Sequence, residues 1–88
     1  MGWRYTVKSG SKLREAIDEG NLEEILDNLE EVWKEIHNRF PKEYDEYDLE
    51  NDLSDIDGVR EDGDEEDVDM LLSDLYDYCD NTRIWIEL

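Results

Sequence analysis

The chain has 88 residues, a mass of 10.5 kDa, 28 acidic and 9 basic residues, and a net charge of −19. That length predicts one small domain over residues 1–88, and the charge excludes nucleic acid and anionic membranes as direct partners, because both repel it. No apolar run approaches the roughly 18 residues of a membrane span, and the start lacks an apolar signal region, so we expect a cytoplasmic protein. The one cysteine excludes an internal disulfide.

Both ends of the chain alternate apolar and polar residues, which predicts two short β-strands over residues 3–8 and 82–88. After the first strand, apolar residues at helical spacing predict a short helix over 12–19. Ser11 stands directly before this helix and is the expected N-cap, because a serine side chain accepts a hydrogen bond from the first turn.

The clearest element is a long amphipathic helix over residues 22–40, in which apolar residues follow the 3.6-residue period. Asn21 is its expected N-cap, and Pro41 ends it, because a proline pushes the residue before it out of the helical region. A weaker apolar pattern from Leu49 predicts a further helix that ends at Gly58.

Residues 57–67 contain two glycines, seven acidic residues and one apolar residue, which predicts a solvated, flexible loop. Apolar residues at helical spacing from Val68 to Cys79 then predict the last helix. The whole order predicts an α+β fold, with three to four helices packed on a small two-stranded sheet formed by the N- and C-terminal strands. The pattern leaves open whether these strands pair in parallel or antiparallel.

The sequence offers little for catalysis. It has one histidine, no glycine-rich phosphate loop and no nucleophile elbow, so we expect no enzyme and no cofactor. The single Cys79 continues an apolar helical stripe, which favours a buried structural thiol.

A metal site is also not predicted. Residues 55–58 resemble the middle of a calcium loop, but Leu53 and Arg60 occupy positions where such a loop does not place them. Weak, unspecific calcium binding stays open, and a dedicated calcium sensor is not expected.

The acidic charge is unevenly distributed. Residues 43–80 contain 18 acidic residues and one base, a net charge of −17, whereas the other 50 residues carry 10 acidic and 8 basic residues. A halophilic surface would be acidic everywhere, so this asymmetry argues against a global adaptation. If fully helical, the segment would span about 57 Å at ~1.5 Å per residue, or one charge per ~3.4 Å, which is the spacing along one DNA strand.

We therefore expect the acidic segment to bind a positively charged protein, in particular a nucleic-acid-binding enzyme. The carboxylates expected to form the binding surface are Asp45, Glu46, Asp48, Asp52, Asp55, Asp62, Asp64, Glu65, Glu66, Asp67, Asp74 and Asp77. Four tyrosines lie among these acids and belong either to the edge of the core or to the interface. They are Tyr44, Tyr47, Tyr76 and Tyr78.

In its size and in the acids of residues 43–80, the chain resembles the small nucleic-acid mimics of phages and mobile elements, which include anti-restriction and anti-CRISPR inhibitors. The resemblance implies an inhibitor that occupies the basic groove of a nucleic-acid-binding protein as a DNA or RNA mimic. Three alternatives stay open: an immunity protein or antitoxin against a basic nuclease, a chaperone of basic proteins, and an acidic phage or bacterial protein of unassigned role.

Overall fold

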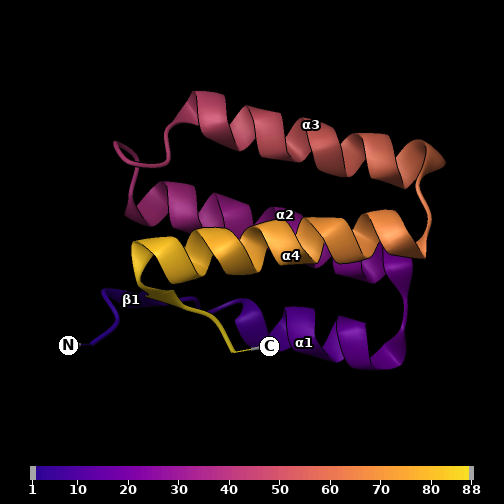
Figure 1. Ribbon diagram of the computed structural model, residues 1–88, viewed down its shortest axis with the longest axis horizontal. Coiled ribbons are helices and arrows are strands. Elements are labelled where there is room, and N and C mark those ends of the chain that lie inside the picture. Colours follow the sequence, from indigo (N-terminus) through magenta and orange to yellow (C-terminus); the bar gives the residue numbers. More distant parts are fainter. Residues whose placement is uncertain (1, 88) are drawn as a thin grey trace.

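The computed structural model describes residues 2–87 and is mostly helical, with a minimal sheet (Figure 1). The elements in chain order are β1 (Tyr5–Thr6), α1 (Gly10–Glu19), α2 (Leu22–Arg39), α3 (Glu46–Asp62), α4 (Glu65–Thr82) and β2 (Ile84–Trp85). The α+β prediction is thus correct in outline, but the strands are shorter than the alternating patterns suggested.

Helix α2 is the centre of the molecule and contacts α1, α3 and α4. In Figure 1, α3 and α1 lie on opposite sides of α2, and α4 crosses in front of it. Asn21 caps α2 as predicted, since its side chain accepts a hydrogen bond from the Glu24 N–H. Six residues of α2 are buried, so the predicted apolar stripe is the face on which the other helices pack.

The two ends of the chain pair in parallel, with Tyr5 opposite Ile84 and Thr6 opposite Trp85. Beyond these residues, the Arg4 N–H donates to the Arg83 carbonyl over 2.7 Å. All four helices lie between the two strands, because parallel strands need a long crossover connection. Ile84 and Ile86 face the core, as the alternation predicted; Leu88 lies outside the described residues.

The predicted loop over residues 57–67 is wrong, and so is the helix end at Gly58. Helix α3 continues through Gly58 to Asp62, and α4 begins at Glu65, so only residues 63–64 connect them. Of the seven acids that suggested a solvated loop, three lie in α3 and Asp64 is the N-cap of α4. The other three, Glu65, Glu66 and Asp67, form the first turn of α4, where the positive end of the helix dipole stabilises carboxylates.

The predicted cap of α1 is also wrong. The helix begins at Gly10, so Ser11 lies inside it, and Ser9 occupies the N-cap position without a side-chain cap bond. The helix ends at Gly20, which has a left-handed backbone with φ of 71° and whose N–H bonds the carbonyls of Ala16 and Ile17.

A single hydrophobic cluster joins residues from all four helices and from the terminal strands. The radius of gyration is 12.4 Å, close to the value of about 12 Å for a compact chain of this length. Cys79 is buried in this cluster as predicted, and burial raises the pKa of its thiol to about 12. The thiol is therefore protonated and unreactive near neutral pH.

Candidate functional site

Most of the excess negative charge lies on two neighbouring antiparallel helices, α3 and α4 (Figure 1). Helix α3 has eight acidic residues and one arginine, and α4 has seven acidic residues and no base, so together they carry a net charge of −14. Helices α1 and α2 are close to balanced by comparison, at −1 and −4. The folded chain therefore keeps the charge asymmetry seen in its sequence.

All twelve carboxylates of the predicted binding surface lie in α3, in α4 or at their N-caps. Nine are exposed, and the half-buried ones are Asp48, Asp52 and Asp67. Exposure makes the nine accessible to a partner, whereas the other three are partly covered by the fold.

The structure brings four of these carboxylates together where α3 faces α4. Asp48, Asp52 and Asp55 are spaced i, i+4 and i+7 and share one face of α3. Burial raises the pKa of Asp52, and the charges of Asp55, Asp48 and Asp74 raise it further, although a hydrogen bond from the Tyr44 hydroxyl acts in the opposite direction. Asp52 thus sits in a locally repulsive, acidic environment.

Three of the predicted residues have a structural role as helix caps. Asp45 accepts a hydrogen bond from the Asp48 N–H over 3.0 Å. Asp64 accepts from the backbone of Glu66 and Asp67, and the Asp67 side chain accepts in return from the Asp64 N–H over 3.2 Å. Removing a cap costs about 1 kcal/mol. These three residues are therefore poor probes of binding.

The four tyrosines divide evenly between core and surface. Tyr44 and Tyr78 pack with Trp33 in an aromatic cluster, with ring centroids 5.0 to 5.4 Å apart. Tyr47 is 72% exposed on α3, and Tyr76 is 42% exposed on α4. Tyr44 and Tyr78 therefore belong to the core, whereas Tyr47 and Tyr76 are accessible to a partner.

The one base of the acidic segment helps to attach α3 to α2. The Arg60 guanidinium lies 3.0 Å from an Asp27 carboxylate oxygen and 3.6 Å from one of Glu30. Because Arg60 pairs with carboxylates of α2, it does not neutralise the solvent-facing side of α3.

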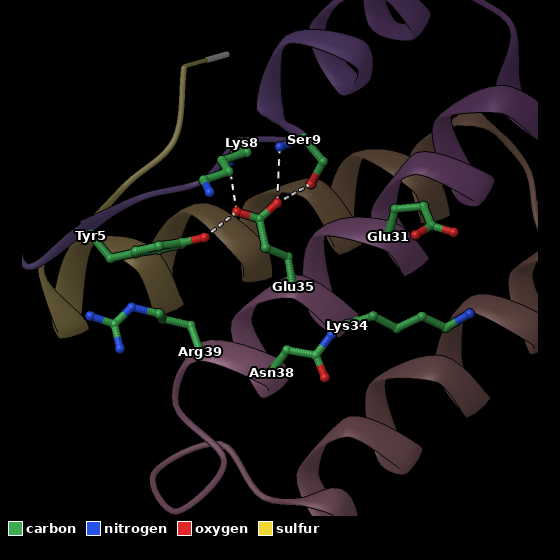
Figure 2. Close-up of a pocket in the computed structure, with 8 residues that line it drawn as sticks. All are labelled: Tyr5, Lys8, Ser9, Glu31, Lys34, Glu35, Asn38 and Arg39. Carbon is green, nitrogen blue, oxygen red and sulfur yellow. Dashed lines mark hydrogen bonds between the residues drawn. The ribbon is translucent and has the colours of Figure 1, made fainter.

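A second polar site, which no pattern in the sequence indicated, surrounds Glu35 of α2 (Figure 2). Its carboxylate accepts four hydrogen bonds: from the Tyr5 hydroxyl, the Lys8 N–H, and both the N–H and the hydroxyl of Ser9, over 2.6 to 2.9 Å. Burial alone would raise the pKa of Glu35, but these donors lower it below its ordinary value. Glu35 is thus an ionised anchor that holds the β1–α1 connection on α2.

The cavity beside Glu35 is open and has a volume of about 450 Å³. Lys8, Lys34 and Arg39 line it, but Figure 2 shows the side chains of Lys34 and Arg39 extending away from the carboxylate in different directions. The side chains do not converge on a point in the cavity, so the arrangement favours a structural role over a binding one.

Within residues 2–87, no group of three or more His, Cys, Asp or Glu side chains is placed to hold a metal ion. The segment that resembled a calcium loop, residues 55–58, lies inside α3. A helix does not wrap its side chains and carbonyls around one ion as a calcium loop does, so the resemblance has no structural counterpart.

No family model matches this chain, and no curated protein or solved structure matches it either. Among the described residues, none of the helices is long and apolar enough to cross a bilayer.

Proposed function

We propose that the protein binds a positively charged nucleic-acid-binding protein and occupies its basic groove as a DNA or RNA mimic. The observation that carries this proposal is the net charge of −14 on the paired helices α3 and α4. In the proposed complex, carboxylates of these helices stand in for phosphates, and long-range attraction raises the association rate.

The density of charge supports mimicry of a duplex. The 18 residues of α4 span about 27 Å at ~1.5 Å per residue. A DNA duplex of that length carries about 16 charges, since both strands together contribute one per ~1.7 Å. Because the acidic segment folds back on itself into two helices, it has about twice the linear density of a single extended helix, which compares well with the duplex value.

The charge also works against folding, which favours a role in binding. Blocks of like charge raise the free energy of the compact state. At Asp52 burial is the main cause of the raised pKa, and the charges of nearby carboxylates raise it further, so the folded chain holds this charge less readily than the unfolded chain does. A surface that only had to stay in solution would not need four carboxylates gathered at one place.

The test is a retention experiment with a matched control. The wild-type chain is immobilised, a nuclease-treated bacterial lysate is passed over it, and bound proteins are eluted either by salt or by added duplex DNA. The site variant replaces Asp55, Asp62 and Asp74 with Asn and Glu66 with Gln; none of these side chains makes a hydrogen bond or an ion pair among the described residues. The control variant removes the same charge from α1 and α2. It replaces four glutamates with Gln: Glu15, Glu19, Glu23 and Glu31.

We expect one basic nucleic-acid-binding protein to stay bound past ~0.3 M salt, where contacts between exposed charges are largely screened, and to be released by duplex DNA. The site variant should retain it at least tenfold less than the control variant. Equal loss with both variants, or no release by DNA, would contradict the proposal. A retained nuclease that duplex DNA does not release would instead favour the immunity-protein alternative.

A further inference from the structure

Exposed aromatic side chains gather where the end of α4 meets the strands. Trp3 is 50% exposed and Trp85 is 42% exposed, and their ring centroids are 5.3 Å apart. Together with Tyr76 of α4 they line a cavity of about 260 Å³. Exposed aromatic groups in contact with one another mark interaction sites, because burying them on binding is strongly favourable.

The same cavity has an acidic rim and an apolar floor. Asp77 and Asp80 of α4 line its edge, and Cys79, Ile84 and Ile86 lie beneath. Cavities for small-molecule ligands are usually about 300 Å³ or larger, so this one suits a single long side chain. Aromatic faces beside carboxylates attract cations, since the ring faces and the carboxylates are both negative.

The chain already uses this chemistry elsewhere. The Arg4 guanidinium lies 4.6 Å from the Phe40 ring centroid, and it pairs with the Glu43 carboxylate through two hydrogen bonds of 2.7 and 3.0 Å. At the cavity, an aromatic group and a carboxylate are likewise combined, but no arginine or lysine within residues 2–87 stacks on Trp3, Tyr76 or Trp85.

We propose that this aromatic cavity binds one arginine or lysine side chain of the basic partner and so anchors that protein beside the acidic surface. The inference rests on the proposed function, because it takes its occupant from a positively charged protein. Charge complementarity selects this occupant over a second copy of the chain, since two chains of −19 repel each other. Tryptophan and tyrosine are also the residues that most often dominate binding energy at interfaces.

The direct test uses a hexa-arginine peptide as the probe and the three indole N–H signals of the wild-type chain in NMR spectra. Trp3 and Trp85 should shift during the titration, whereas the buried Trp33 should not. Single Trp3→Leu and Trp85→Leu variants assign these signals. A peptide with citrulline in place of arginine, which is neutral and of the same shape, should give no shift. Shifts confined to the backbone of α3 and α4 would overturn the inference.

Affinity measurements separate this inference from the proposed function. Replacing Trp3 and Trp85 by Leu keeps the charge and should weaken hexa-arginine binding about 5- to 10-fold at low salt. A double variant with Asp77→Asn and Asp80→Asn keeps the aromatic rings but removes the carboxylates at the edge of the cavity, and it should also weaken hexa-arginine binding.

If only the site variant, neutralised at residues 55, 62, 66 and 74, loses affinity for the peptide, the aromatic cavity plays no part in binding and the proposed function stands. If only the tryptophan variant loses affinity, the acidic surface is not the binding face. No binding by the wild-type chain would overturn both proposals. A dimer in sedimentation that dissociates in the tryptophan variant would show that a second copy covers the cavity.

Discussion

Helices α2 and α3 have nearly the same length, 18 and 17 residues, but they have opposite relations to the fold. Six residues of α2 are buried, whereas Ile56 is the one buried residue of α3. Helix α2 organises the core, and α3 lies against it with most of its acidic side chains in solvent. Half of the charge of −14 on α3 and α4 therefore resides on the helix with the fewest buried residues.

The difference between α2 and α3 is also seen when one carboxylate of each helix is compared. Glu35 of α2 and Asp52 of α3 both accept a hydrogen bond from a tyrosine hydroxyl. Glu35 receives three further donors from Lys8 and Ser9, and the pKa of Glu35 is lowered. Asp52 has acidic neighbours instead, and burial together with their charges raises its pKa. The same kind of bond therefore helps to stabilise a charge on α2, whereas on α3 it only partly offsets the effects of burial and repulsion.

The largest change in stability should come from truncating the one buried side chain of α3. Ile56 is 1% exposed, so Ile56→Ala should lower the free energy of unfolding by about 3 kcal/mol, through lost apolar burial and the cavity left behind. Ile56→Val, the matched control, should cost about 1 kcal/mol. Urea unfolding followed by circular dichroism measures both, and a loss below about 0.5 kcal/mol for alanine, by the same scale, would show that α3 is not held by packing.

The second largest loss of stability should come from replacing Glu35, the carboxylate of α2 that holds the β1–α1 connection. Glu35→Gln removes the charge and leaves donors of the β1–α1 connection without an acceptor, so we expect a loss of about 2 kcal/mol at pH 7. The pKa of Glu35 is lowered on folding, so its contribution is present above the ordinary value of 4.5 and is lost as the pH falls through the folded value. Unfolding curves from pH 3 to 7 should therefore converge for wild type and variant at low pH.

Salt should act on the charge of α3 and α4 without any change in contacts. Raising the concentration from low salt to ~0.3 M shortens the screening length, and should stabilise the wild-type chain by about 1 kcal/mol. The site variant, neutralised at residues 55, 62, 66 and 74, should gain clearly less stability from salt than the control variant, neutralised at residues 15, 19, 23 and 31. Thermal unfolding at each salt concentration provides the measurement, and equal gains would mean that repulsion is spread over the whole surface.

The smallest effect has the opposite sign to the substitutions above. Asp52→Asn keeps an acceptor for the Tyr44 hydroxyl and removes a repulsive charge, so it should stabilise the chain by about 0.5 kcal/mol at pH 7. The raised pKa of Asp52 means that its favourable contribution is full below the unfolded value of about 3.8 and is lost as the pH rises through the folded value. The gain from this substitution should accordingly vanish near pH 3, and destabilisation at pH 7 would show that the hydrogen bond outweighs the repulsion.

The helices with a strong apolar period could be predicted from the sequence, because their buried residues recur every three to four positions. Helix α3 could be predicted only in part, since its acids cover nearly all of its surface and its periodic signal is weak. The first turn of α4 is hard to predict because runs of acids are typical of loops, although Asp64 and Asp67 have the spacing of a capping box.

The contacts that give single carboxylates their roles lie beyond any local pattern. Glu35 meets donors 26 to 30 positions away, and the acidic neighbours of Asp52 include Asp74 on another helix. The sequence could indicate that residues 43–80 carry the charge, but not which carboxylates cap helices, which cluster, and which stay free. The aromatic cavity could not be predicted for the same reason, because Trp3 and Trp85 come from opposite ends of the chain.

The parallel pairing of β1 with β2 has a consequence for the order of folding. Tyr5 and Ile84 are 79 positions apart, and closing a loop of that length costs about 4 kcal/mol of chain entropy. Each helix needs only local contacts, so the bundle is free to form first and bring the two strands within reach. During synthesis the sheet must therefore wait until residues 84–85 have left the ribosome, and the Trp3–Trp85 contact is completed only then.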